Sequence, residues 1–328
     1  MAGKKKKEIV YSGVDSFVSS LKTFQNISIN EFKPVEKIPT GSLLLDEMLG
    51  GGIPRSKLTE FYGKPSSGKS SIATAIASNI IKNNGRVLWI DLENSFDPNY
   101  SKSIGLDINE EKKNFILING APTGDDVLEI INRAIHSNEF DLIVLDSVST
   151  LIPTVDYDKE IGEQRIGSVA TLLSLSLKKL IASLAISKSA LIFINQERAK
   201  INVYGSAGTD STGGNALKFF ASLRIYFKQI ETINEKDGTI KGIKTQLLVK
   251  KSKVSQQGRQ AILEFYFENG FKVAQEIFQL ALLKGIIKQG GAWYSYGENK
   301  WQGAISVIET LEKDEKLFEE IKEKVMSL

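Results

Sequence analysis

The amino-acid sequence predicts an α/β fold with a central, mostly parallel sheet, and three observations lead to this prediction. A glycine-rich loop at residues 63–70 follows a short apolar segment and precedes a stretch with helical spacing of apolar residues. Further short apolar segments each end in a polar residue, as buried strands of a parallel sheet commonly do. Between residues 58 and 196, strand-like segments alternate with helix-like ones. Such alternation is typical of a doubly wound sheet with helices on both faces.

The loop, GKPSSGKS, fits the phosphate-binding pattern G-x-x-x-x-G-K-[ST] at every fixed position. A strand predicted at residues 58–62 and a helix predicted at residues 71–82 supply the flanks that this motif requires. Its glycines let backbone N–H groups turn toward phosphate oxygens, its lysine reaches the β- and γ-phosphates, and its last serine binds Mg²⁺. The alternative is an ordinary turn before a surface helix, and the flanks argue against it. The predicted nucleotide-binding residues here are Gly63, Pro65, Ser66, Ser67, Gly68, Lys69, Ser70 and Ser71.

Polar side chains follow three predicted strands, at the edge where open α/β sheets bind their ligands. The VLWID strand is followed by Glu93, which lies near the phosphate loop if the two strands are neighbours. The LIVL strand ends in Asp146, the position of a Walker B carboxylate that holds Mg²⁺ or its water. The ALIFI strand leads to Asn195 and Gln196. Each residue alone is as readily a cap or a turn, but together with the loop they predict an active-site edge.

The rest of the chain adds a short helix ended by three glycines at residues 50–52 and two long helices, expected at 127–137 and 166–187. Three further strands are expected, with Asp237-Gly238 as a hairpin turn, so the sheet continues in antiparallel fashion. These strands are predicted at residues 223–227, 245–250 and 262–267.

The sequence divides into an N-terminal helical arm with a linker (1–37), a core (38–269) and a small C-terminal α+β domain (270–328). An apolar stripe on the arm needs a surface to pack on, either in its own domain or on a neighbouring subunit. The stripe consists of Val14, Phe17, Val18, Leu21 and Phe24.

Two long segments, residues 154–167 and 197–215, fit neither helix nor strand. Loops of this length inside a compact domain are usually functional or disordered. The second contains Arg198 and a Gly213-Gly214-Asn215 turn, whose N–H groups could contact phosphates.

Composition excludes several classes of protein. There is no cysteine, which rules out disulfides and thiolate sites, and the single His136 cannot build a metal cluster. No apolar run reaches about 18 residues, so we expect a cytoplasmic protein with no membrane partner. The formal net charge is +3, but the four lysines at positions 4–7 leave residues 8–328 at −1. Binding to a polyanion must therefore rely on local patches.

One such patch is the stretch 238–263, which holds six basic residues and no acidic one. Lys251 and Lys253 stand two residues apart at a strand end, so their side chains are expected to point the same way. Without a nearby acid they repel each other, which suggests a polyanion if the site is closed. A solvated strand end is the alternative.

Several runs of residues resemble those of the bacterial RecA-type recombinases, in the same order and across nearly the whole chain. The runs are YGKPSSGKSS, IDLENSFDPNYSKSIGLDI, IVLDSVSTLIP, LIFINQERAKI, STGGNALKFFASLR and GAWYSY. The resemblance implies a RecA-like P-loop ATPase that uses ATP and Mg²⁺, forms a homo-oligomeric helical filament on single-stranded DNA, pairs it with homologous duplex DNA and exchanges strands. It also implies a LexA-type repressor and loading mediators as partners.

The resemblance assigns roles around the nucleotide. Glu93 would be the general base and Gln196 would sense the γ-phosphate. Asp97 and Tyr100 match the adenine side. The lysine pair would reach ATP on the adjacent subunit and act with the catalytic Lys69, in the manner of arginine fingers.

The resemblance also assigns the DNA and subunit contacts. Lys218 and Phe219 would link the nucleotide to the subunit interface, and the N-terminal stripe would pack on the neighbouring subunit. The positions that match DNA contacts are Ser174, Lys178, Gly213, Gly214 and Asn215, with Arg165 and Ile166 in the first loop and Arg198 and Ile201 in the second.

The chain departs from the family at a few points. Thr171 replaces a basic residue common in relatives, residues 203–211 have diverged, and the chain ends at Leu328 without a long acidic tail. A hexameric helicase or a clock-type ATPase would lack the GGNALKF run and the lysine pair. A non-enzymatic binding module would not need Glu93 and Asp146 beside a phosphate loop.

Overall fold

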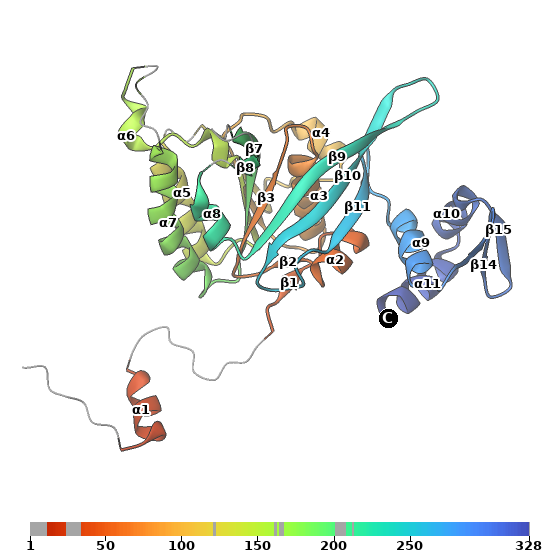
Figure 1. The fold of residues 1–328 in the computed structure, drawn as a ribbon, viewed down its shortest axis with the longest axis horizontal. Helices are drawn as coiled ribbons and strands as arrows, with labels where there is room; N and C mark the ends of the chain where they lie inside the picture. Colours follow the sequence, from red (N-terminus) through yellow and green to blue (C-terminus); the bar gives the residue numbers. More distant parts are fainter. Residues whose placement is uncertain are drawn as a thin grey trace, which may run out of the picture. The chain divides into compact units, whose positions relative to one another are not determined.

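The computed structural model describes residues 12–23, 34–120, 123–160, 163, 167–200, 208–211 and 213–327, with the backbone alone at 198–200 and 208–211. The chain divides into two compact units, residues 1–35 and 36–328. In the first unit, α1 (Val14–Leu21) contains four of the five residues of the predicted apolar stripe (Figure 1), and the fifth, Phe24, lies outside the described residues. None of its residues is buried, and Val14 and Phe17 are 77% and 46% exposed. Among the described residues of this unit, α1 therefore presents partly exposed apolar side chains.

The second unit is organised around one large sheet, with strand order β12-β11-β10-β9-β3-β7-β6-β4-β5 and with β8 paired to β7. The strands from β9 through β3, β7, β6 and β4 to β5 pair in parallel. The strands β9 to β12 pair antiparallel, which confirms the predicted continuation. The strands are β3 (Leu58–Gly63), β4 (Val87–Asp91), β5 (Phe115–Asn119), β6 (Leu142–Asp146), β7 (Ala190–Lys200), β8 (Gly208–Ser211), β9 (Leu223–Asn234), β10 (Ile240–Ser252), β11 (Gln260–Tyr266) and β12 (Gly270–Phe271).

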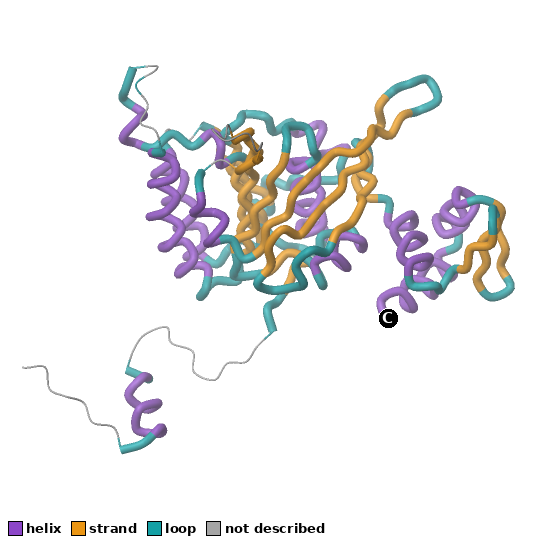
Figure 2. Tube along the Cα trace, viewed as in Figure 1, coloured by secondary structure: helices purple, strands orange, loops and turns teal. Residues whose placement is uncertain are grey.

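Helices cover both faces of this sheet (Figure 2). One apolar core contains Ile72 and Ile76 of α3 with Trp89 of β4, and the other contains Ile131 of α5 with Leu177 of α7. Two faces of a parallel sheet are thus buried, which explains why its strands are almost wholly apolar. The helices of this region are α2 (Leu43–Leu49), α3 (Lys69–Lys82), α4 (Pro98–Ser103), α5 (Gly124–Ser137), the 3-10 turn η1 (Val148–Thr150), α6 (Thr154–Tyr157), α7 (Ser168–Leu184) and α8 (Asn215–Phe220).

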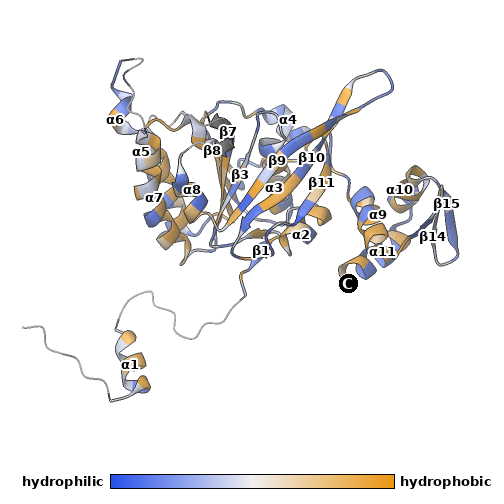
Figure 3. Ribbon diagram, in the orientation of Figure 1, coloured by the Kyte–Doolittle hydropathy of each residue, from blue (hydrophilic) through white to orange (hydrophobic). Residues whose placement is uncertain are grey.

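The two long segments predicted to lack regular structure are not wholly irregular. The first begins with the single turn α6. In the second, β7 continues to Lys200 because β8 pairs with it, and α8 begins at Asn215. The strands β9 and β10 are also longer than predicted, because their hairpin extends past the buried part of the sheet. Figure 3 shows a mostly hydrophilic tip on that hairpin.

The short strands β1 (Lys37–Ile38) and β2 (Ile53–Pro54) pair beside α2, which ends at Gly50 in the left-handed conformation that glycine favours. The C-terminal part has its own apolar core. Its elements are α9 (Val273–Leu283), β13 (Lys288–Gly290), β14 (Trp293–Tyr296), β15 (Asn299–Gln302), α10 (Ala304–Lys313) and α11 (Glu315–Ser327). Among the described helices, none is long and apolar enough to cross a membrane.

Candidate active site

The phosphate loop joins β3 to α3, as the motif predicts. Gly68 has φ +89°, and a Cβ there would lie 2.8 Å from the Cδ1 atom of Ile243. A Cβ at Gly63 would lie 2.2 Å from the backbone oxygen of Phe227. Both positions therefore require glycine, one for its backbone conformation and both for the close approach of the neighbouring strands.

Lys69 is buried at the start of α3, with its ammonium group turned back over the loop. Its Nζ donates to the backbone oxygens of Lys64 at 2.7 Å and Gly63 at 3.3 Å. Burial lowers the pKa of Lys69, whereas the nearby carboxylates of Asp146 and Glu93 raise it. The Lys69 ammonium thus lies between the loop and the acidic strand ends, where it can bind a phosphate group.

Three carboxylates gather at the ends of β4 and β6. Burial raises the pKa of Asp146 to about 6, a hydrogen bond from Ser70 lowers it, and the charges of Glu93 and Asp91 raise it. One oxygen of Asp91 accepts from the N–H groups of Ser95 (2.8 Å) and Phe96 (2.7 Å). Among the described residues, its other oxygen is buried without a hydrogen-bond partner.

Glu93 is held by two side chains, one just after β6 and the other in β7. Its Oε1 accepts from the Ser147 hydroxyl at 2.5 Å and from the Gln196 amide at 2.8 Å. The sheet order places β7 and β6 between β3 and β4, so the strands of the loop and of Glu93 are not neighbours. Glu93 nevertheless lies near enough to the loop for its charge to act on Lys69. Ser147 is an additional residue of this site that the sequence analysis does not identify.

These residues suit Mg²⁺. Ser70 and Asp146 are joined by a hydrogen bond, and the neighbouring Asp91 has a buried oxygen without a partner among the described residues. No three acidic, histidine or cysteine side chains in the described ranges form an all-protein metal cage. Mg²⁺ is commonly held by one or two protein oxygens together with water and phosphate oxygens, and Ser70 and Asp146 can supply two such oxygens.

A cavity of about 420 Å³ extends from the loop toward the β9–β10 hairpin. Phe267 lines it and packs against the Tyr100 ring at a centroid distance of 6.2 Å. The Tyr100 hydroxyl lies 3.0 Å from the Ser71 hydroxyl. Asp97 caps α4, since its carboxylate accepts from the backbone N–H of Asn99 at 2.8 Å. Phe267 is absent from the predicted set, although an aromatic residue at a strand end could have indicated it.

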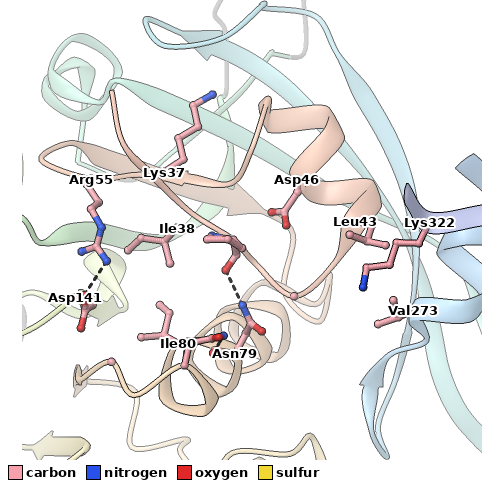
Figure 4. A pocket seen from close by; sticks show the side chains of 14 residues that line it. Lys37, Ile38, Leu43, Asp46, Arg55, Asn79, Ile80, Asp141, Val273 and Lys322 are labelled. Carbon is pink, nitrogen blue, oxygen red and sulfur yellow. Dashed lines mark hydrogen bonds and ion pairs between the residues drawn. The ribbon is translucent and has the colours of Figure 1, made fainter. Parts of the chain in front are cut away.

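A second cavity, of about 590 Å³, lies at the amino ends of β4 and β6, away from these residues (Figure 4). Its charged Arg55 and Asp141 pair with each other at 2.8 Å, and Asn79 donates to the backbone oxygen of Pro39. It contains no residue of the phosphate loop. The larger volume therefore does not mark the site of nucleotide chemistry.

The predicted DNA-contacting residues lie on α7 and at the start of α8. Lys178 is exposed, and Ser174 donates to the backbone oxygen of Ala170 at 2.8 Å. A Cβ at Gly213 would lie 2.5 Å from Leu173, and one at Gly214 would lie 3.1 Å from Ala170. The glycine turn therefore lies directly against α7.

Other predicted DNA contacts are less fully placed. Arg165, Ile166 and Ile201 lie outside the described residues, and Arg198 is described only as a backbone position of β7. The Oδ1 atom of Asn215 accepts from Lys218 at 3.4 Å.

Lys251 and Lys253 point the same way, as predicted, because both donate to the backbone oxygen of Phe219, at 2.9 and 3.4 Å. Lys251 also donates to the backbone oxygen of Lys218 at 2.5 Å. The expectation that no acid lies nearby is wrong. Burial and the Lys253 cation lower the pKa of Lys251, but the Glu60 carboxylate, distant in sequence, raises it.

Comparison with known proteins agrees with this geometry. Residues 21–272 match the RecA N-terminal domain and residues 275–328 match the RecA C-terminal domain. The chain is 39% identical over 295 residues to Protein RecA of Thermus aquaticus, which covers 89% of this chain and 85% of that protein. It is 37% identical over 296 residues to Protein RecA of Streptomyces coelicolor, which covers 89% and 77%.

A solved structure with a similar fold is described as the crystal structure of the RadB recombinase. It has a TM-score of 0.54 and 18% identity, and the match covers 71% of this chain and 97% of that one. The predicted fold class and family are thereby confirmed. The chain belongs to the RecA family of DNA-dependent ATPases, which pair homologous DNA and exchange strands.

Proposed function

We propose that this chain hydrolyses ATP with Mg²⁺ at the loop of residues 63–70 while it is assembled as a filament on single-stranded DNA. The observation that carries the proposal is the convergence of Lys69, Glu93 and Asp146 at one edge of the sheet. Phosphoryl transfer depends mainly on positioning and charge stabilisation, and these three side chains can supply both.

The residues of the loop bind and orient the nucleotide. Lys69 would exchange its backbone acceptors for phosphate oxygens. Ser70 would bind the metal through its hydroxyl, and Asp146 would hold the metal or its water. Bound Mg²⁺ supplies neutralisation of the negative charge that develops on the phosphate oxygens. Glu93 orients the attacking water and accepts its proton. Gln196 senses the γ-phosphate, and its hydrogen bond to Glu93 transmits the change to the general base.

The adenine base of the nucleotide would lie in the cavity beyond the loop. Tyr100 and Phe267 present aromatic surfaces on that side, and Asp97 fixes the start of α4, which carries Tyr100. Aromatic faces bind a purine by stacking, with little demand on hydrogen bonding.

The DNA backbone lies along α7 and the glycine turn. Lys178 is one turn of helix from Ser174, so the two share a face of α7. The backbone N–H groups near Gly213, Gly214 and Asn215 add to this face. Arg165, Ile166, Arg198 and Ile201 of the two loops remain DNA contacts predicted from the sequence.

The subunit interface completes the site. Lys251 and Lys253 act on the nucleotide of the adjacent subunit, beside the exposed Phe219 and the half-buried Lys218. The apolar stripe of α1 packs on a neighbouring copy. The three-part division at residues 37 and 269, the LexA-type repressor, the loading mediators and the cytoplasmic location remain predictions from the sequence.

Electron microscopy of the purified protein with single-stranded DNA and a slowly hydrolysed ATP analogue tests the proposal. Helical filaments that require both the DNA and the nucleotide are expected. Closed hexameric rings, or no assembly at all, would contradict it.

A further inference from the structure

A buried carboxylate lies in the middle of β3, three residues before the phosphate loop begins. Glu60 has no exposed surface. Its Oε1 accepts from the Nδ2 group of Asn195 at 2.9 Å, and its Oε2 accepts from the Nε group of Arg224. Because β7 and β9 flank β3, the two oxygens take partners from opposite sides.

The β7 side leads to the catalytic edge. The Oδ1 atom of Asn195 accepts from the backbone N–H of Gln196 at 2.9 Å. Gln196 in turn donates to Glu93 at 2.8 Å. Glu60 is thus linked to the proposed general base of its own subunit through Asn195, which bonds the backbone of Gln196, and through the Gln196 side chain, which bonds Glu93.

The β9 side leads to the lysine pair. Arg224 faces Lys251 across the β9–β10 ladder, and its guanidinium carbon lies 4.4 Å from the centre of the Tyr62 ring. Lys251 then donates to the last carbonyls of α8. Glu60 pairs directly with Arg224, and its charge acts on the Lys251 ammonium in the opposite direction to the charges of Arg224 and Lys253.

Burying the charged carboxylate of Glu60 at the centre of a sheet costs free energy, because the charge loses its contact with water. A buried ion pair is weak evidence for stability, because apolar residues of similar volume often stabilise a core as well or better. Both oxygens of Glu60 are hydrogen-bonded, so relief of an unfavourable contact does not explain why this position carries a charge. A role in positioning accounts for a carboxylate that touches one group on each side.

We propose that Glu60 is a positioning residue that sets both ends of the hydrolysis machinery. Through Asn195 it fixes Gln196 of its own site. Through Arg224 it fixes the lysines offered to the next subunit. The inference rests on the proposed function, in which those lysines act on a neighbour, and it couples the two sites through three adjacent strands.

Glu60→Gln keeps the shape of the side chain and removes its charge. The kcat of the DNA-dependent ATPase should fall at least about tenfold, while the nucleotide Kd of the protomer changes by less than about threefold, because small misplacements act mainly on the chemical step. Thr59→Val is the matched control, since Thr59 is equally buried on the same strand and its hydroxyl has no partner among the described residues. It should keep the wild-type kcat.

A second variant separates positioning from folding. Glu60→Leu combined with Arg224→Met replaces the ion pair by apolar side chains and should fold, as judged by its thermal melting. Its kcat should nevertheless fall at least about tenfold, since the lysines and Gln196 lose their common anchor. A folded double variant with wild-type kcat would overturn the proposal.

Mixed filaments then test both faces. Glu60→Gln subunits are mixed either with Glu93→Gln subunits or with Lys251→Ala/Lys253→Ala subunits, and ATPase is measured on single-stranded DNA. We expect recovery in neither mixture, because each Glu60→Gln subunit is impaired at both of its faces. Recovery in either mixture would show one face intact and overturn the double role.

The mixture of Glu93→Gln with Lys251→Ala/Lys253→Ala subunits is the reference. It should recover ATPase, because each subunit supplies what the other lacks. If it fails, the shared site of the proposed function is wrong, and the kcat of the Glu60 variants still decides whether Glu60 positions Gln196.

Discussion

The side-chain amide of Gln196 donates a 2.8 Å hydrogen bond to the carboxylate of Glu93. Gln196 lies in β7 and Glu93 follows β4, and these two strands are separated in the sheet by β6. Ser147, just after β6, donates to the same oxygen at 2.5 Å. Three strand ends are thus tied together at the carboxylate, so a shift of Gln196 toward a phosphate group would change the surroundings of the proposed base directly.

DNA binding should depend on salt through Lys178. Neutralising one phosphate contact should flatten the slope of log K against log salt concentration by about one. Lys178→Ala is therefore expected to reduce the slope in titrations with single-stranded DNA. Lys179→Ala is the matched control, because that ammonium pairs with Glu129 of α5 at 3.1 Å and should leave the slope unchanged. Equal slopes for the two variants would remove Lys178 from the DNA face.

Metal binding should weaken in mild acid. Burial raises the pKa of Asp146 to about 6, so its carboxylate becomes protonated as the pH falls through that value. A protonated carboxyl group is a poor ligand, and the effect of Mg²⁺ on nucleotide affinity should therefore decline between pH 7.5 and 5.5. Isothermal titration with and without Mg²⁺ measures this effect.

Asp146→Asn provides the control for protonation of the nucleotide itself, which affects both proteins equally. The wild-type protein should show a steeper pH dependence of the Mg²⁺ effect than the variant. The same pH dependence in both would contradict a role for Asp146 in holding the metal.

A buried acid also links the C-terminal part to the core. Glu276 of α9 accepts from the Ser42 hydroxyl at 2.7 Å and from the Leu43 N–H at 2.6 Å, at the start of α2. Burial raises the pKa of Glu276 to about 7. Because the folded-state pKa lies above the ordinary value, this group's contribution to stability is fully present below about pH 4.5 and is lost as the pH rises through about 7.

Glu276→Gln removes that titration. Between pH 5 and 8, the free energy of unfolding of the wild type should fall relative to the variant by an amount on the order of 2 kcal/mol. Asp146 titrates in both proteins and cancels from the difference. Denaturant unfolding at the two pH values measures it, and a constant difference would show that Glu276 does not titrate in this range.

Much of the catalytic edge could be predicted from sequence because its signals are local. The phosphate loop is a continuous motif, and Glu93, Asp146 and Gln196 each follow an apolar strand. The order of the strands could not be read in this way, since pairing between β3, β7 and β9 joins distant parts of the chain.

Glu60 is a clearer example of a residue whose role depends on contacts between distant parts of the chain. In the sequence it is one acidic residue inside a short strand, and such a residue is usually solvated. Its partners Asn195 and Arg224 lie 135 and 164 residues away. Only the fold brings the three together, so the sequence alone does not show an acid near the lysine pair.

In the proposed mechanism, Glu93 drives hydrolysis at this site. The direct measurement is the steady-state ATPase rate of Glu93→Gln on single-stranded DNA, together with its nucleotide and DNA affinities. The variant should bind both ligands as the wild type does, while its rate falls by about 10²–10⁴, the usual contribution of a general base. Glu139→Gln, which alters a surface acid paired with Arg86, should leave the rate unchanged. Equal rates for Glu93→Gln and the wild type would show that Glu93 is not the general base.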